Sequence, residues 1–227
     1  MNIKVDIWTD VMCPFCYIGK RNFEIALKQS GLAEQLDIHY KSFQLNPSFK
    51  SESPVKVYDY LAQTKGWTIE YSRQVHEHVS TMAASVGLTF NFDLAVVANS
   101  FDAHRLLQYA KTVQKADVLN EALFDAHFCQ GINTGDHQEL LRLALRSGLD
   151  AEATGRVLAD NEFAAAVEED MYEARLLGIS GVPFFLFNCK YAVSGAQAPE
   201  VFLNALQKCI DAQASMPEAI QGGDNHF

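Results

Sequence analysis

The sequence predicts an α/β protein whose sheet domain is interrupted by a large all-helical insertion, and three observations support this. A strand-helix-strand pattern opens the chain, and strand signals return only near its C-terminal end, before one last helix. Between them helical periodicity prevails, and β-branched strand-like runs are nearly absent. Neither short half can bury a core alone, so we expect residues 1–50 and 179–214 to form one discontinuous domain, residues 51–178 a helical insertion domain and residues 215–227 a flexible tail.

The opening unit begins with alternating apolar residues over residues 3–7, which predict a short strand that ends at a turn. A helix follows over about residues 16–30, with Pro14 at its first turn, where the missing N–H costs nothing. Residues 36–43 read as a second strand. In such a unit the crossover is right-handed and the two strands are parallel, so the end of the first strand lies at the carboxyl edge of the sheet, where sites are usually built.

The insertion consists of amphipathic segments separated by glycines and turns. The candidate helices span residues 55–65, 69–86, 95–115, 117–128, 137–146, 151–158 and 163–177. After it, the runs VPFFLFN (182–188) and YAVSG (191–195) predict a hairpin, and a last helix covers residues 199–212.

Composition narrows the classes of partner. Lys and Arg number 18 against 28 Asp and Glu, a formal net charge of -10 spread along the chain, so we expect neither nucleic acid nor an anionic membrane as a partner. No run reaches the roughly 18 apolar residues of a membrane span, and MNIKVDIWTD is charged where a signal peptide needs an apolar core. We therefore expect a cytoplasmic protein, monomeric or homodimeric, whose five cysteines are free thiols by default.

The stretch DVMCPFCYIG places Cys13 and Cys16 directly between the first strand and its helix. One helical turn holds two thiols at C-x-x-C spacing within bonding reach, and the free N–H groups of a helix start favour a thiolate. We expect Cys13, nearer the helix terminus and the exposed turn, to be the nucleophile, and Cys16 to be the more buried resolving thiol. Neither Pro14 nor Phe15 between them adds a charge that would stabilise the thiolate further.

A structural zinc site is the other chemistry that C-x-x-C serves, but it needs a second pair of ligands, and no other C-x-x-C exists here. His76 and His78 are two residues apart, which points them to different faces of a helix. We therefore expect no metal and no bound cofactor, with a redox-active disulfide formed by the cysteine pair itself. Three further cysteines are expected to act as small, partly buried apolar side chains: Cys129, Cys189 and Cys209.

The stretches DVMCPFCYIGKR and GVPFF, with the helical block between them, resemble the DsbA family of thioredoxin-fold oxidoreductases, most closely its FrnE-like branch of cytoplasmic dithiol-disulfide isomerases. The resemblance implies a thioredoxin-like fold and disulfide exchange with protein or low-molecular-weight thiols. It also implies a cis peptide between Val182 and Pro183, lying against the cysteine pair, with the Val182 backbone able to pair with an extended substrate. Some FrnE-like proteins carry a second cysteine pair near the C-terminus, which this chain lacks.

Two alternative functions remain open. Kappa-class glutathione transferases and 2-hydroxychromene-2-carboxylate isomerases share the helical insertion, but they usually have a serine where this chain has Cys13. They also tend to carry an acidic residue and an arginine where this chain has Gly195-Ala196-Gln197-Ala198. These differences argue against a dedicated glutathione-conjugating enzyme, although glutathione stays a candidate redox partner. The other alternative is a binding module or holdase in which the cysteines are incidental.

Two polar residues near the pair each allow two roles. His104, in a stretch that resembles a family segment facing the catalytic groove, either stabilises the Cys13 thiolate or shuttles a proton, or is simply satisfied within the helical domain. Asp10 either accepts the Cys16 proton through water or orders the turn before the helix, and the turn role is favoured. A set of strand aromatics is expected in the core, not in a binding groove: Trp8, Phe43, Phe184 and Phe185.

Overall fold

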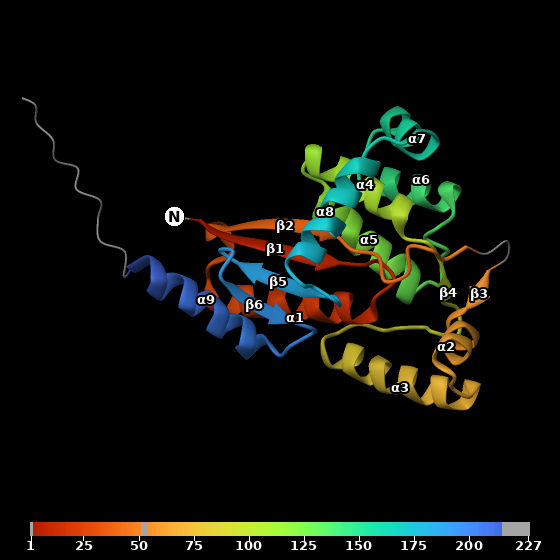
Figure 1. Ribbon diagram of the computed structural model, residues 1–227, viewed down its shortest axis with the longest axis horizontal. Helices are drawn as coiled ribbons and strands as arrows, with labels where there is room; N and C mark the ends of the chain where they lie inside the picture. Colours follow the sequence, from red (N-terminus) through yellow and green to blue (C-terminus); the bar gives the residue numbers. More distant parts are fainter. Residues whose placement is uncertain (1, 51–53, 215–227) are drawn as a thin grey trace, which may run out of the picture.

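The computed structural model describes residues 2–50 and 54–214, and its centre is a four-stranded sheet (Figure 1). The strand order is β2-β1-β5-β6, with β1 (Ile3–Thr9), β2 (Leu36–Ser42), β5 (Phe184–Phe187) and β6 (Tyr191–Ser194). β1 is parallel to β2 and antiparallel to β5, and β5 and β6 form the hairpin. This mixed sheet confirms the predicted α/β class. The predicted tail, residues 215–227, lies outside the described residues.

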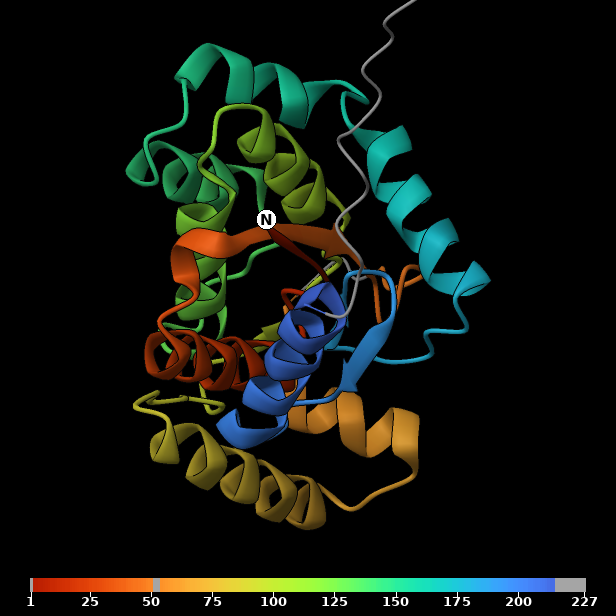
Figure 2. The same cartoon turned by 90° about the vertical axis from the view of Figure 1, so that its left-hand side faces the viewer.

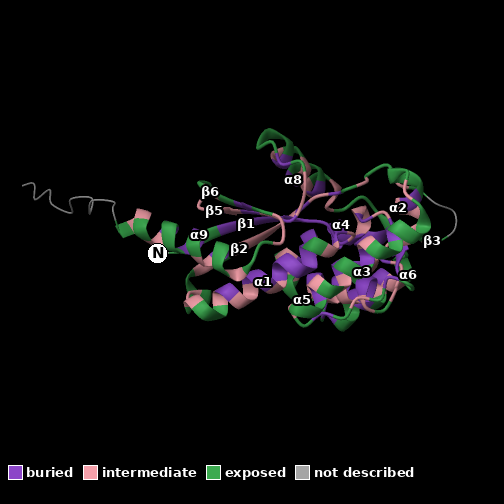
Figure 3. Cartoon of the chain, turned by 90° about the horizontal axis from the view of Figure 1, so that it is seen from below, coloured by how far each residue is buried: buried purple, intermediate pink, exposed green. Residues whose placement is uncertain are grey.

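One face of the sheet is covered by α1 (Pro14–Ser30) and α9 (Pro199–Ala214), which lie side by side beneath it (Figures 1 and 2). Alternate residues of β1 face these helices because side chains along a strand point to opposite sides. Val5 is completely buried there, and Phe23 of α1 packs its ring against Phe185 and Phe202. Figure 3 shows the buried residues running through β1 and along α1, whereas α9 turns exposed residues outward. This core fixes the helix that carries both cysteines against the sheet.

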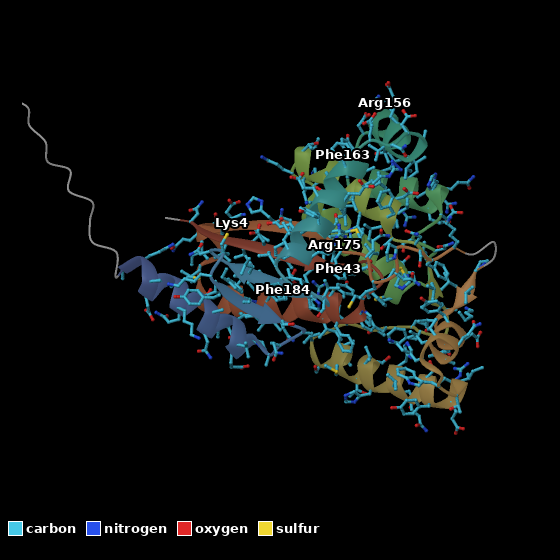
Figure 4. All side chains as sticks on the ribbon, viewed as in Figure 1. Lys4, Phe43, Arg156, Phe163, Arg175 and Phe184 are labelled. Carbon is cyan, nitrogen blue, oxygen red and sulfur yellow. The ribbon has the colours of Figure 1, made fainter. Side chains whose placement is uncertain are left out.

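The opposite face is partly covered by α8 (Ala164–Leu176). Trp8 is completely buried there, and its indole N–H donates to the backbone oxygen of Asp170 at 3.1 Å. Phe43 and Phe184, labelled in Figure 4 where they lie close to each other beneath α8, pack half-buried against the same cluster. Trp8 and Phe185 are therefore core residues as predicted, while Phe43 and Phe184 lie at the margin of the core.

The segment between β2 and β5 is almost entirely helical. After η1 (Ala33–Gln35) and β2, it contains α2 (Val57–Lys65), α3 (Ile69–Ser85), α4 (Phe101–Thr112), α5 (Ala116–Phe128), α6 (His137–Arg146), α7 (Ala151–Ala159) and α8. Helices α4 to α7 surround their own hydrophobic cluster, which also takes in Val11 from the loop before the cysteines. Among the described residues, no helix is both long and apolar enough to cross a membrane.

The predicted helix over residues 95–115 is wrong at its start. Residues Val96–Val97 form a short strand, β4, which pairs antiparallel with β3 (Val55–Lys56), and α4 begins only at Phe101. The side chain of Asn99 accepts the N–H of Phe101 at 2.9 Å and so separates the extended stretch from the helix. Two-residue strands give no periodic signal, so this pairing could not be read from the sequence.

Candidate active site

The cysteine pair lies where β1 ends and α1 begins. Cys13 is the N-cap of α1, with Pro14 at the first helical positions, and the N–H of Cys16 donates to the Cys13 carbonyl oxygen at 3.0 Å. Both cysteines are free thiols. No side chain caps this helix and its first turn holds no acidic residue, so the positive end of the helix dipole is available to a sulfur anion.

Both thiols are more enclosed than expected. Cys13 is 4% exposed and Cys16 is 2% exposed, so the prediction of an exposed turn at Cys13 is wrong. The helical insertion folds over the pair and packs it in a cluster with residues of α3, α5 and the loop between α3 and β4, such as Val79, Phe124 and Phe92. Within the motif, Phe15 is the most exposed residue, at 39%, and Pro14 is half-buried.

Cys16 is held in its protonated form by its surroundings. Burial raises its pKa well above the ordinary value, and the neighbouring Cys13 acts in the same direction. The side chain of Thr9 and the backbone N–H of Asp10, which donates to Cys16 Sγ at 3.5 Å, oppose this rise only in part. A thiol that is buried and protonated at neutral pH fits the resolving role and requires a route for its proton.

The Val182–Pro183 peptide bond is cis and faces the pair. The thiol of Cys13 donates to the Val182 carbonyl oxygen at 3.4 Å. Pro183 is buried against Gly19 of α1, and a Cβ added to Gly19 would lie only 2.9 Å from Pro183 Cγ. The absence of a side chain at Gly19 therefore lets the helix of the cysteines approach this segment.

Asp10 organises the loop that carries Cys13. Its carboxylate accepts the N–H of Met12 at 3.2 Å and that of Leu45 at 2.7 Å, and it lies 3.5 Å from Nε2 of His104. Burial alone would raise its pKa, but His104 and backbone and side-chain hydrogen bonds outweigh burial and hold the pKa below its ordinary value. An anion with these partners is a poor proton acceptor, so the geometry favours the turn-ordering role for Asp10, and His104 is the buried neighbour of its carboxylate.

A cavity of about 360 Å³ adjoins the pair. Met12 and Pro14 line it from the cysteine loop, and Phe92 and Phe128, which belong to the hydrophobic cluster around the two thiols, line it as well. His127 also lines this cavity, is 2% exposed, and has no hydrogen-bond partner at Nδ1 among the described residues. Burial lowers its pKa to about 4, so His127 is neutral at physiological pH.

Sequence reasoning missed two residues of α5, His127 and Asn120. Both lie on the apolar face of the helix that also carries Phe124, at the i, i+4 and i+7 spacing of one helical face. Two polar residues on such a stripe were the available signal. Only the packing of α5 on α1, where Tyr17 stacks on Phe124, places Asn120 in a cavity with Cys16 and His127 in a cavity with Pro14.

The remaining cysteines differ in their surroundings. Cys209 is completely buried in the core beneath the sheet, and Cys129 is half-buried against the cluster around the dithiol, where burial raises its pKa to about 12. Cys189 is exposed, contrary to expectation, because Asn188 and Cys189 both adopt positive φ in the tight hairpin turn. In the described part of the chain, no group of three or more His, Cys, Asp or Glu residues is placed to hold a metal ion.

Comparison with known proteins agrees with this geometry. A family model described as a DSBA-like thioredoxin domain matches residues 4–207. The crystal structure of a probable DsbA oxidoreductase from Streptomyces coelicolor has 32% sequence identity and a TM-score of 0.88, and covers 98% of this chain and 95% of that chain. The uncharacterized protein YwbO of Bacillus subtilis is 26% identical over 213 residues, which cover 91% of this chain and 96% of that protein.

The fold also extends to more distant relatives. A cytosolic disulfide reductase, DsbM from Pseudomonas aeruginosa, has a TM-score of 0.65 at 17% identity, with 92% of this chain and 99% of that chain covered. At that identity the likeness is one of fold. The family model spans both halves of the sheet and the helical insertion between them, and the chain therefore belongs to the family of DsbA-like thioredoxin-domain proteins.

Proposed function

We propose that this chain is a thiol-disulfide oxidoreductase that uses Cys13 as nucleophile and Cys16 as resolving thiol. The observation that supports the proposal best is the placement of two free thiols one turn apart at the uncapped start of α1. Its substrates are protein or low-molecular-weight thiols and disulfides, and rearrangement of non-native disulfides, the isomerase activity of FrnE-like proteins, belongs to the same proposal.

The reaction follows from the chemistry of the pair. The Cys13 thiolate attacks one sulfur of a substrate disulfide, forms a mixed disulfide and releases the other sulfur as a thiolate. Cys16 then loses its proton and attacks Cys13 Sγ, which forms the Cys13–Cys16 disulfide and releases the second substrate thiolate. Two electrons pass from the dithiol to the substrate, and the reverse sequence oxidises a substrate dithiol.

We further propose that the protein works in the cytoplasm with glutathione as a redox partner. The fold neighbour DsbM is described as cytosolic, and one of its solved structures is described as being with GSH. These descriptions concern DsbM itself. They make glutathione the natural first reagent with which to test this chain.

A glutathione redox titration tests the main proposal. In a variant with Cys129, Cys189 and Cys209 replaced by alanine, we expect one reversible two-electron transition of the Cys13–Cys16 pair. In addition, Cys16→Ser is expected to accumulate a mixed disulfide with glutathione, whereas Cys13→Ser is expected to form none at position 16. Absence of a reversible couple would remove the proposal.

The second candidate function is a glutathione-dependent transferase or isomerase acting on a small molecule. The observation in its favour is the largely apolar cavity of about 360 Å³ beside Met12 and Pro14. Cys13→Ser distinguishes the two candidates, because it removes disulfide exchange completely and leaves an enzyme that only binds glutathione active. We favour the oxidoreductase because both thiols of a resolving pair are present.

A further inference from the structure

A small enclosed cavity lies directly beside Cys16. Its volume is about 10 Å³, close to the smallest space that holds one water molecule. Five residues with polar side chains line it, together with apolar groups such as Phe124 and Pro183. The polar residues are Thr9, Cys16, Lys20, Tyr40 and Asn120.

Asn120 is the residue of this cavity whose side-chain polar atoms lack hydrogen-bond partners among the described residues. It is 1% exposed, and neither Nδ2 nor Oδ1 has a hydrogen-bond partner among the described residues. A buried polar group without a hydrogen-bond partner lowers stability by about 1–3 kcal/mol. A buried carboxamide with two such atoms therefore calls for a partner such as an ordered water molecule. Its donor and its acceptor together match the hydrogen-bonding capacity of one water molecule.

Lys20 lines the cavity and belongs to a cluster of ion pairs. Its side chain is 6% exposed, and its ammonium group pairs with Asp117 at 3.2 Å and with Glu121 at 3.1 Å. Glu24 is a third partner. Burial alone would lower the pKa of Lys20, but these carboxylates outweigh burial and hold the pKa above its ordinary value. Lys20 therefore stays protonated and does not accept the Cys16 proton.

We propose that Asn120 holds one water molecule against Cys16 Sγ and that this water receives the Cys16 proton when Cys16 resolves a mixed disulfide. The inference rests on the proposed oxidoreductase function. Asn120 acts through the water on Cys16 and is a positioning residue, contributed by the helical insertion to chemistry on α1.

The bond between Cys16 Sγ and Cys13 Sγ forms, the bond between Cys13 Sγ and the substrate sulfur breaks, and the substrate leaves as a thiolate. The Cys16 proton passes to the water as the new S–S bond forms, and from the water it is lost to bulk solvent. The bound water ends unchanged, and the dithiol has given two electrons to the substrate and one proton to solvent.

The opposite neighbour of Cys16 is unsuited to this task. The Asp10 carboxylate is occupied by Met12, Leu45 and His104, and its pKa lies below the ordinary value. Its contribution to Cys16 is a backbone N–H, which can donate to the sulfur but cannot take a proton from it. The cavity beside Asn120 therefore remains as the route.

Stopped-flow reaction of the reduced protein with dithiobis(nitrobenzoate), an aromatic disulfide, separates the two steps. The first release of nitrothiobenzoate reports attack by Cys13, and the second reports resolution by Cys16. Cys129, Cys189 and Cys209 are replaced by alanine so that each release has one source. We expect Asn120→Leu to slow the second release by about tenfold or more and to leave the first unchanged, because proton transfer is assisted only in the second.

Two further variants are matched to this one. Asn120→Ser keeps a polar group and enlarges the space for water, so its second release should stay close to that of the parent protein. Ser72→Ala removes another completely buried, unpartnered polar atom, on α3, and should change neither release.

The outcomes separate the inference from the proposed function. Absence of the second release in the parent protein counts against the oxidoreductase proposal itself. A normal second release in Asn120→Leu overturns only the water site, as does slowing of both releases to the same extent. If Asn120→Leu does not fold, a high-resolution crystal structure of the parent protein decides, since the inference requires a water bonded to Asn120 beside Cys16 and a dry cavity contradicts it.

Discussion

The backbone N–H of Asp10 points at the sulfur of Cys16 and donates to it at 3.5 Å. Through its carbonyl oxygen, the same residue accepts the N–H of Cys13 at 3.0 Å. One buried residue at the end of β1 therefore contacts both members of the dithiol through its backbone, while its carboxylate is fixed by Met12 of the same loop and by Leu45 and His104 from outside it. Changes in the charge around Asp10 should consequently affect the cysteines as well as stability.

Removal of the His104 side chain should lower the stability of the protein, because the Asp10 carboxylate beside it is buried. We expect His104→Ala to lower the free energy of unfolding at pH 7 by about 1–3 kcal/mol, because it leaves the buried Asp10 carboxylate without one of the groups that hold its pKa down. The folded-state pKa of Asp10 is lowered below 3.8, so the stabilisation is present above that pH and is lost as the pH falls through the folded-state value. Urea unfolding at pH 7 and near pH 3 measures the difference.

The control for this experiment is His137→Ala. His137 pairs with Asp102 at 2.7 Å on the surface, where its side chain is 52% exposed, so its removal should cost at most about 1 kcal/mol. A deficit in His104→Ala that is equally large at both pH values would contradict the argument. An unchanged rate of disulfide exchange in His104→Ala would show that the histidine serves the fold alone.

His127 should make the protein sensitive to mild acid. Burial lowers its folded-state pKa from 6.5 to about 4. Between these two pH values the unfolded chain binds a proton at this histidine and the folded chain does not. Stability is therefore complete above about pH 6.5 and falls by up to about 3 kcal/mol as the pH approaches 4. His127→Asn should flatten the urea-unfolding profile over this range, and the exposed His78→Asn should leave it unchanged.

Alkylation should distinguish the two thiols of the motif. In reduced protein that lacks Cys129, Cys189 and Cys209, we expect iodoacetamide at pH 7 to label Cys13 well before Cys16, because burial and Cys13 raise the pKa of Cys16. Peptide mapping by mass spectrometry gives the ratio. Labelling in concentrated urea is the control, where both cysteines should react at similar rates. Preferential labelling of Cys16 in the folded protein would reverse the assigned roles.

Gly19 should tolerate no side chain. Gly19→Ala places a Cβ 2.9 Å from the ring of Pro183, and we expect it to lower stability by about 1–3 kcal/mol and to slow disulfide exchange by displacing α1 from the Val182 segment. Gly155 of α7 is the matched control, since a Cβ there meets nothing within 4 Å. Gly155→Ala should raise stability by about 0.5–1 kcal/mol, and thermal or urea unfolding of both variants checks the contrast.

The sequence was most informative where local pattern and tertiary contact coincide. Alternation in Ile3, Val5 and Ile7 predicts a strand, and all three side chains are buried against the helices beneath the sheet. The position of Cys13 at the start of α1 followed in the same way from Pro14 and the helical period after it. These features depend on backbone preferences that each segment carries by itself.

Features that arise from packing between distant segments were not readable. The enclosure of Cys13 depends on Phe92 and Phe128, which belong to the insertion and whose periodicity says only that they face a core. Likewise, Asn120 and His127 occupy apolar-face positions on a correctly predicted helix, but which neighbours that face meets is decided by the docking of α5 on α1. The hydrophobic pattern of one segment does not show which other segment packs against it.

The position of β1 between β2 and β5 affects how the chain folds during its synthesis. β2 is synthesised soon after β1, so the two strands can pair early. Val5 and Ile7 pair on the other side with Phe187 and Phe185 of β5, which is synthesised only after the whole helical insertion. During translation one edge of β1 is therefore left without its neighbour, a condition that favours aggregation and holding by chaperones. A nascent chain on the ribosome thus carries both thiols of the motif long before the strand pair that completes their surroundings can close.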